Sequence, residues 1–224
     1  MNSICIFGVF VADLCFFGNK IPVKGETVLG NNHIVGPGGK GSNQAIAAAR
    51  LNGNVHFITK VGNDNHADMA FSLYKEAGVN VDCIIRDPSL STGVAGIMID
   101  EDGNNAINVF AGAAKHLNSD DVDKNLEIFK KSKIFLTQME TPEEVTLYSL
   151  KKAKENNCEV LIPEDCLVGT SFDGEGKNKN LGEIQDNEII LDIGINTINK
   201  IKKKIDESNT ILWNGPAGYF ENNN

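Results

Sequence analysis

The chain has 224 residues, enough for one large domain or two small ones. Its 41% hydrophobic and 23% charged residues are typical of a folded globular protein, which excludes whole-chain disorder and a coiled coil. The net charge of −9 disfavours binding to nucleic acid or to an anionic membrane, because both would repel the protein.

Several residue patterns exclude further classes of protein. The five cysteines are odd in number and form no C-x-x-C pair, which argues against a disulfide framework or a zinc site and favours the reducing cytoplasm. The four histidines lie in separate segments, so no metal site is predicted. The apolar residues 4–12 have no preceding Lys or Arg, which indicates a buried first strand rather than a signal peptide. No apolar run reaches the roughly 18 residues that a membrane-spanning helix needs.

Strands and helices alternate through the first part of the chain. Strands are predicted at residues 4–10, 55–61, 81–86 and 134–138, an extended segment at 27–35, and a hairpin at 94–100 and 106–110. Helices are predicted at residues 43–51, at 67–77 with a stop at Gly78, at 119–131 after a Ser119 cap, and from Thr141 to about 156. Thr141 and Glu144 have the spacing of a capping box around Pro142.

The pattern changes after residue 163. A short strand is predicted at 160–162, a long polar loop at 169–182, and strands at 189–193 and 210–213. Ile195, Ile198, Ile201 and Ile205 recur at helical spacing and predict an amphipathic helix. The alternation as a whole predicts an α/β fold with a mainly parallel sheet flanked by helices, and a small antiparallel element near 27–35 and 94–110.

The strongest local signal is the glycine-rich run of residues 36–43, G-P-G-G-K-G-S-N, which opens a helix. It matches the dinucleotide-binding pattern G-x-G-x-x-G, so an oxidoreductase has to be considered. Against that function, the run lies well after the first strand and holds Lys40 inside the turn. It is not a Walker A loop, because Gly41 follows Lys40. The glycines would let a small polyhydroxyl ligand approach helix N-terminal amides, with Lys40 and Asn43 as further donors. A glycine-rich turn into a packed helix, without a ligand, is the alternative.

Two acidic residues could join this site. Asp13 follows the first predicted strand, and Glu140 follows the strand at 134–138. Ligands of open parallel sheets lie at the carboxyl ends of the strands, and carboxylates there accept hydrogen bonds from sugar hydroxyls. We therefore expect Asp13, Lys40, Asn43 and Glu140 to converge on one pocket. Taken singly, each acid is also compatible with a helix cap or a solvated surface position.

Short motifs run in a fixed order through the first part of the chain. They are Gly8 with Ala12-Asp13, Pro22 with Gly25-Glu26-Thr27, residues 38–44 (G-G-K-G-S-N-Q) with 47–51 (A-A-A-R-L), Val61-Gly62-Asn63-Asp64, Gly78-Val79, Thr92-Gly93, Gly112-Ala113, and 138–142 (Q-M-E-T-P). With these motifs, residues 1 to about 158 resemble the ribokinase, or phosphofructokinase-B type, carbohydrate kinases.

The resemblance implies a central α/β sheet with a small β lid, and transfer of a phosphoryl group from ATP, with Mg²⁺, to a sugar hydroxyl. It implies substrate contacts at Asp13, Gly39, Lys40, Asn43 and Glu140, and it leaves open a homodimer formed through the β lid. Two departures stand out. Val11 replaces the Asn that ribokinases usually carry two residues before the acid, so another sugar or a nucleoside is open. The G-A-G-D-type motif, which supplies the family's base and anion hole, does not occur after residue 158; residues 173–176 (D-G-E-G) have the wrong order.

A second set of motifs occupies the rest of the chain. They are residues 161–165 (L-I-P-E-D), 191–194 (L-D-I-G) and 210–221 (T-I-L-W-N-G-P-A-G-Y-F-E). Residues from about 153 to 221 resemble the C-terminal, nucleotide-binding half of phosphoglycerate kinase, a kinase of glycolysis. The resemblance implies nucleotide contacts at Asn214, Gly215, Pro216 and Glu221. That family's later G-G-G-D-[ST] motif and its phosphoglycerate-binding half do not occur in these residues.

The two resemblances meet near residues 154–163, which predicts a ribokinase-like part at 1–158 and a phosphoglycerate-kinase-like part at 159–224. The join keeps the helix-to-strand alternation, so a continuous α/β sheet is expected. The first function hypothesis is an ATP-dependent sugar kinase that is incomplete in these residues. The alternatives are a phosphoglycerate kinase fragment, a non-catalytic sugar- or nucleotide-binding chimera, and, last, a dinucleotide-binding oxidoreductase.

Overall fold

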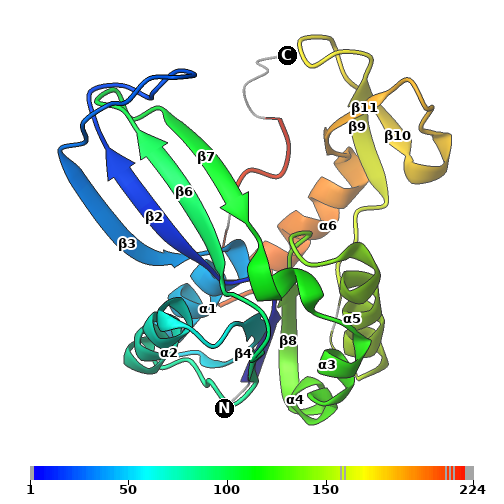
Figure 1. Cartoon of the computed structure of the whole chain (residues 1–224). Helices are drawn as coiled ribbons and strands as arrows, with labels where there is room; N and C mark the ends of the chain where they lie inside the picture. The colour runs from blue at the N-terminus through cyan, green and yellow to red at the C-terminus, as the bar shows by residue number, and fades with distance from the viewer. Residues whose placement is uncertain are drawn as a thin grey trace. The chain divides into compact units, whose positions relative to one another are not determined.

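The computed structural model describes residues 3–156, 158, 160–209, 211, 213 and 215–219. The chain forms two compact units, Met1–Val160 and Leu161–Asn224, which are described separately (Figure 1). No helix among the described residues has both the length and the apolar character needed to cross a membrane.

The first unit is built on a parallel four-stranded sheet in the order β5-β4-β1-β8. Its strands are β1 (Ser3–Phe7), β4 (Asn54–Val61), β5 (Ile84–Arg86) and β8 (Ser132–Thr137). Its helices are α1 (Lys40–Arg50), α2 (Asn65–Ala77), α3 (Ser119–Asp123), α4 (Leu126–Lys131) and α5 (Glu143–Glu155). A short 3₁₀ helix spans Gly112–His116. The predicted parallel α/β sheet is confirmed.

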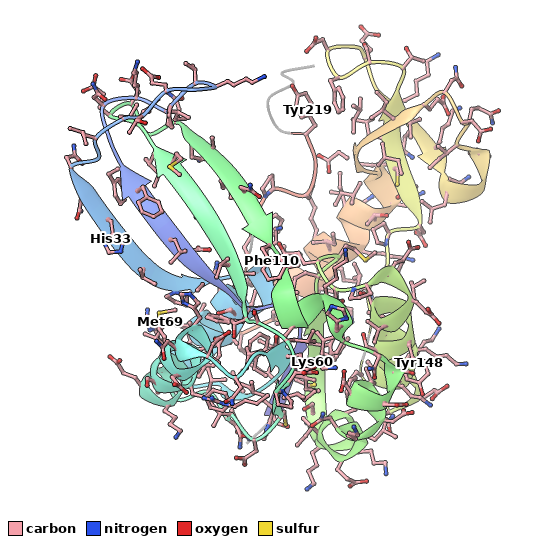
Figure 2. The ribbon with its side chains drawn as sticks, in the orientation of Figure 1. His33, Lys60, Met69, Phe110, Tyr148 and Tyr219 are labelled. Atoms are coloured by element: carbon pink, nitrogen blue, oxygen red, sulfur yellow. The ribbon has the colours of Figure 1, made fainter. Side chains whose placement is uncertain are left out.

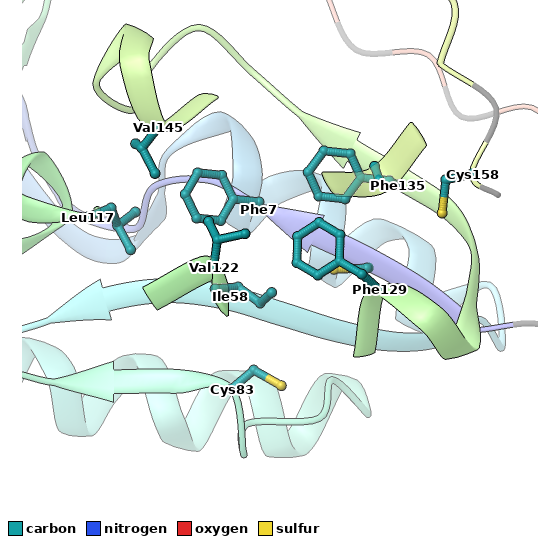
Figure 3. Packing of buried hydrophobic residues seen from close by; sticks show 11 residues of the cluster. Phe7, Ile58, Cys83, Leu117, Val122, Phe129, Phe135, Val145 and Cys158 are labelled. Atoms are coloured by element: carbon teal, nitrogen blue, oxygen red, sulfur yellow. The ribbon is translucent and has the colours of Figure 1, made fainter. Parts of the chain in front are cut away.

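The core of this unit lies on both faces of the sheet, because successive residues of a strand point to opposite sides. On one face Phe7 and Ile58 pack with Val122 of α3, Phe129 of α4 and Val145 of α5 (Figure 3). On the other face the ring of Phe57 meets that of the fully buried Tyr74 of α2 at 5.4 Å. The Tyr74 hydroxyl donates to Ser42 Oγ of α1 at 2.9 Å, which satisfies its buried polar group.

A second four-stranded sheet, which we call the lid, belongs to the same unit. Its strands are β2 (Val11–Phe17), β3 (Asn32–Gly38), β6 (Gly93–Ile99) and β7 (Asn105–Phe110), in the order β3-β2-β6-β7. The predicted β6–β7 hairpin is confirmed by its antiparallel register. Strand β2 is missing from the sequence prediction, and the predicted 4–10 strand ends at Phe7 instead. The apolar run continues from β1 into β2, so nothing local marks where the chain passes from one sheet to the other.

Helix boundaries follow capping interactions. Helix α2 is confirmed: Asp64 caps its start by accepting from Ala67 N at 3.0 Å, and Gly78 ends it with φ 85°. The predicted helix at 119–131 is instead the two helices α3 and α4, and its cap is Asn118 rather than Ser119. Asn118 Oδ1 accepts from Asp121 N at 3.2 Å and Asp121 Oδ2 accepts from Asn118 N at 3.0 Å, so the two residues form a capping box one residue before the predicted cap.

The predicted capping box of α5 does not form. Pro142 is the N-cap residue, and Glu143 is the first helical residue. The Thr141 hydroxyl is hydrogen-bonded to that of Thr146, and Thr146 Oγ1 also donates to Pro142 O at 3.0 Å. Because the Thr146 hydroxyl gives its one proton to Pro142 O, Thr141 Oγ1 donates to Thr146 Oγ1 and links the residue before Pro142 to the first turn of the helix.

The second unit contains a three-stranded antiparallel sheet of its own. Its strands are β9 (Asp165–Gly169), β10 (Lys177–Asn180) and β11 (Ile189–Ile193), in the order β10-β9-β11, with a 3₁₀ turn at Leu181–Glu183. The expected continuous sheet is wrong, because these strands pair only with each other among the described strands. The expected strand at 160–162 is not formed, and the expected loop at 169–182 contains β10. The strand predicted at 210–213 lies partly outside the described residues.

Helix α6 (Ile195–Asp206) confirms the amphipathic helix and is anchored by Asp165. This buried carboxylate accepts hydrogen bonds from the amides of Asn196 and Thr197, both at 2.9 Å, from Thr197 Oγ1 at 2.6 Å and from Asn178 Nδ2 at 2.9 Å. Burial raises the pKa of Asp165, but the bonds from Thr197 and Asn178 outweigh it and hold the pKa below its usual range. The carboxylate therefore occupies the helix N-terminus itself.

Candidate functional site

A cavity of about 460 Å³ lies between the lid and the start of α1 in the first unit. It is lined by Val9, Val11, Asp13, Gly39, Lys40, Asn43, Ala95, Ile97, Ile107, Val109, Ala111 and Glu140. The structure thus brings all five residues that were predicted to contact substrate to one place, although they come from β2, from the start of α1 and from the β8–α5 loop. Their role as ligand contacts stays a prediction.

Asp13 lies in a strand rather than in a loop after the first strand, which corrects the sequence interpretation. It is the third residue of β2, opposite Gly36 of β3 and Ala95 of β6. Partial burial raises the pKa of its carboxyl group. A Cβ atom at Gly38 would lie 2.0 Å from Asp13 Oδ1, so the carboxylate fills the space that any other side chain at position 38 would need.

The glycine-rich run is not a loop, since residues 36–38 end β3 and α1 begins at Lys40. Gly39 between them has φ 89°, and a Cβ atom there would lie 2.5 Å from Val9 O. Both observations require glycine at this position. The sharp change from strand to helix places Lys40 and Asn43 at the mouth of the cavity.

Three amides at the start of α1 already have hydrogen-bond acceptors within the protein, which the sequence did not indicate. The Lys40 amide donates to Glu140 Oε2 at 2.9 Å, the Ser42 amide to Val9 O at 3.2 Å, and the Asn43 amide to Gly39 O at 3.0 Å. Glu140 therefore caps α1 from a loop far away in the sequence. The side chains of Lys40 and Asn43 are further donors at this end of the cavity.

Lys40 Nζ also pairs with Glu140 Oε1. Asp13, Lys40 and Glu140 together carry two negative charges and one positive charge, so the polar side of the cavity favours a neutral ligand over a phosphate. Carboxylates accept hydrogen bonds from hydroxyls, while Lys40 and the Asn43 amide group can donate to hydroxyl oxygens. This combination suits a polyhydroxyl compound, and it disfavours the dinucleotide interpretation.

Sequence reasoning missed the apolar side of the cavity. Val11, Ala95, Ile97, Ile107 and Val109 all project from the lid toward it. The alternating pattern of the predicted hairpin held a signal for four of them, but not for which face would be turned to the ligand. Val11 was noted only as a departure from a family motif.

Of the four residues predicted to contact a nucleotide, the structure describes two, Gly215 and Pro216. Gly215 and Pro216 are exposed, and Gly215 has φ 73°. Asn214 and Glu221 lie outside the described residues. Nearby, the Tyr219 amide donates to Leu191 O at 2.7 Å, and the Tyr219 ring lies 5.1 Å from that of Phe172. Among the described residues, no group of three or more His, Cys, Asp or Glu side chains is placed to hold a metal ion, so no residue is assigned to Mg²⁺.

Comparison with known proteins gives two family matches. Residues 1–166 match the model of the pfkB family carbohydrate kinases, and residues 121–224 match that of phosphoglycerate kinase. The two matches overlap over residues 121–166, which include β8, α5 and the start of β9.

Individual relatives agree with the first match. Deoxyribokinase of Salmonella typhimurium is 35% identical over 160 residues, covering 71% of this chain and 52% of that protein. Ribokinase of Bacillus subtilis is 38% identical over 144 residues, covering 64% of this chain and 49% of that protein. Among solved structures, ribokinase from Giardia lamblia superposes with a TM-score of 0.64 at 31% identity, over 70% of this chain and 52% of that chain.

A further solved structure, Arabidopsis thaliana ribokinase complexed with ribose and ATP, superposes with a TM-score of 0.62 at 28% identity, over 71% of this chain and 53% of that chain. The chain thus spans about half the length of the relatives it matches. Because the family model covers residues 1–166, the chain belongs to the pfkB family of carbohydrate kinases.

Proposed function

We propose that this chain is the sugar-binding part of an ATP-dependent carbohydrate kinase of the ribokinase type. The observation that carries the proposal is the convergence of Asp13, Gly39, Lys40, Asn43 and Glu140 on one cavity of about 460 Å³. In this role Asp13 and Glu140 accept hydrogen bonds from sugar hydroxyls, Lys40 and Asn43 donate to them, and the lid excludes water. Relatives with this architecture are ribokinases and deoxyribokinases, which supports a pentose as substrate.

The reaction of such a kinase transfers the γ-phosphoryl group of ATP to a sugar hydroxyl, and Mg²⁺ on the phosphates neutralises charge. A solved relative contains ATP and another contains ADP, which supports ATP as the phosphoryl donor here. The described residues of this chain supply the sugar side of the reaction. Unpaired thiols at all five cysteines fit a protein that works in the reducing cytoplasm.

A second candidate function is a non-catalytic chimera that binds sugar or nucleotide, and the match of residues 121–224 to phosphoglycerate kinase favours it. In this case residues 1–158 and 159–224 act as separate parts, and Asn214, Gly215, Pro216 and Glu221 contact the nucleotide. Titration with ATP and with ADP, followed through the fluorescence of Trp213, tests this candidate directly. Binding of nucleotide without sugar-dependent ADP release favours the chimera over the kinase.

A homodimer formed through the lid is also proposed. The lid face opposite the cavity exposes Phe16 (42%), Val35 (40%) and Phe110 (57%), with His33 beside Phe16 (Figure 2). Exposed apolar side chains gathered on one sheet face are typical of protein interfaces. Sedimentation analysis of the chain and of a Phe16→Glu variant tests the proposal, since the charge would be buried at the interface.

Asp13→Ala is expected to weaken sugar binding at least about tenfold. The partly buried carboxylate pairs with ligand hydroxyls, and its removal leaves them unpaired at a cost of about 1–3 kcal/mol, where about 1.4 kcal/mol is a factor of ten. Calorimetry over a panel of pentoses and hexoses measures the effect. Asp102→Ala is the matched control, because Asp102 lies in the exposed β6–β7 turn of the same lid. Unchanged affinity in a folded Asp13→Ala protein would remove Asp13 from the site.

A further inference from the structure

Four residues of the sequence motifs have no part in the proposed sugar contacts, yet the structure brings them together. They are Gly8, Gly41, Gln44 and Gln138, and the lining of the cavity includes none of them. Gln138 follows β8 directly, and Gln44 lies in α1 next to Asn43. We call the hydrogen bond between the two glutamines the glutamine bridge.

The side chain of Gln138 reaches from the end of β8 to α1. Its Nε2 atom donates to Gln44 Oε1 at 2.5 Å. Its Oε1 atom lies 2.2 Å from the position that a Cβ atom at Gly8 would take, and 2.9 Å from the corresponding position at Gly41. Glycine at both positions therefore leaves the space that the amide group occupies. Three chain segments, the ends of β1 and β8 and the first turn of α1, meet around this one side chain.

Stability alone does not account for a glutamine in this slot. Gln138 Oε1 is buried and has no hydrogen-bond partner in the described part of the chain. Burying an unpaired amide oxygen costs free energy, and an apolar side chain of the same shape avoids that cost. Methionine has a similar length and fills irregular spaces well, so it would serve the packing better. The glutamine is therefore explained by what it holds in place.

The bridge holds the loop that carries Glu140. Glu140 lies two residues after Gln138, and its carboxylate both caps the Lys40 amide and pairs with Lys40 Nζ. On the other side of Glu140, the Thr141 hydroxyl is hydrogen-bonded to that of Thr146 in α5. Glu140 thus lies between two side-chain ties, one to α1 through Gln138 and one to α5 through Thr141.

From this arrangement we infer that Gln138 is a positioning residue: through Gln44 it fixes the β8–α5 loop against α1, and so sets where Glu140 and Lys40 meet the sugar. The inference rests on the proposed function, since it concerns the same sugar site. It goes further because Gln138 and Gln44 act only through residues that line the cavity. Without the bridge the Glu140 loop shifts, and hydrogen bonds to a ligand weaken steeply when they are misaligned.

The first test compares Gln138→Met, Gln44→Met and the double variant by calorimetry with ribose and with 2-deoxyribose. Each single variant is expected to bind sugar about fivefold or more weakly. The double variant is expected to be no weaker than the single ones, because each change already breaks the same bond. The double variant also leaves no amide unpaired, so its urea midpoint is expected to equal or exceed that of the unaltered chain. Gln185→Met, the same substitution at an exposed position of the second unit, is the control and is expected to leave sugar affinity unchanged.

A second test needs no sugar. Amide hydrogen exchange at Lys40 reports the cap that Glu140 provides, and exchange at Ala67, which Asp64 caps in the same unit, is the matched control. In Gln138→Met the Lys40 amide is expected to exchange at least about threefold faster, while the Ala67 amide is unchanged. A general loss of stability would instead speed exchange at both amides.

The outcomes separate the inference from the proposed function. Unchanged sugar affinity, unchanged exchange at Lys40, or faster exchange at both amides in the folded Gln138→Met protein would overturn the positioning role and leave sugar binding in place. A double variant weakened by the product of the two single effects would also overturn it, because the glutamines would then act separately. If Gln138→Met does not fold, Gln44→Met breaks the same bond from α1 and decides the question. Binding of neither pentose, nor of any sugar in a wider panel, by the unaltered chain would overturn the proposed function and the inference with it.

Discussion

Replacing Asp121 with alanine is expected to destabilise the first unit by about 3–5 kcal/mol, because it leaves a buried ammonium group without its partner. Lys60 Nζ of β4 lies 2.7 Å from Asp121 Oδ2 of α3, and the two side chains are only 7% and 5% exposed (Figure 2). The same ammonium donates to His116 O at 2.8 Å, which does not replace the lost negative charge. Asp121 Oδ2 also accepts from the Asn118 amide at 3.0 Å, so the variant loses a capping interaction as well.

Urea unfolding followed by circular dichroism measures this change. The only tryptophan, Trp213, belongs to the second unit, so its fluorescence reports that unit separately. Asp68→Ala is the control: it removes the partner of Arg86 from a pair whose Asp68 side chain is 66% exposed, and it is expected to cost about 0–1 kcal/mol.

A double variant, Lys60→Met with Asp121→Ala, sharpens the test of the buried pair. It is expected to recover part of the loss, because no buried charge then remains. If Asp121→Ala costs as little as the surface control, or if the double variant is no more stable than the single one, the buried charge is not the cause.

The second large effect concerns catalysis: the 224 residues by themselves are expected not to turn over ATP at a kinase-like rate. A sugar hydroxyl needs a general base within hydrogen-bond reach, which is worth about 10²–10⁴-fold in rate. Donors fixed near the transferring phosphoryl group are worth about 10²–10³-fold each. The ribokinase-type motif that would supply both does not occur after residue 158.

Asp165, Asp173 and Asp192 are the acids of the second unit that could substitute for that base, and nothing in their spacing along the chain directs them at Asp13 and Lys40. Two of them are engaged locally: Asp165 accepts four hydrogen bonds from Asn178, Asn196 and Thr197, and Asp192 Oδ1 accepts from the Ile193 amide at 2.7 Å. A coupled ADP-release assay over pentoses, hexoses and nucleosides measures the rate, with the Asp13→Ala protein giving the sugar-independent background. Sugar-dependent turnover near about 1 s⁻¹ or faster, within the usual kinase range of about 1–100 s⁻¹, would mean that another group acts as the base.

The amino-acid sequence by itself determined the elements whose signals are local. Asp64 sets the start of α2 with a side-chain cap, and Gly78 sets its end with a left-handed backbone conformation. The alternating residues of the 94–110 segment produce the β6–β7 hairpin. Residues at strand ends and at the helix start, Lys40 and Glu140 among them, were also sufficient to predict a convergent site. Each of these signals depends on a few neighbouring residues, so it can be recognised without knowing the fold.

Tertiary structure decided which strands pair and which polar groups remain for a ligand. The apolar run at the N-terminus is divided between two sheets, which makes Asp13 a lid residue instead of a loop residue. The Lys40 amide is capped by Glu140, a hundred residues away, so the expected backbone donor is already used. The apolar lining of the cavity exists only because the register of three lid strands turns Val11, Ile97 and Val109 to the same face. Strand partners, remote caps and shared faces depend on contacts between distant parts of the chain, and local periodicity carries no information about them.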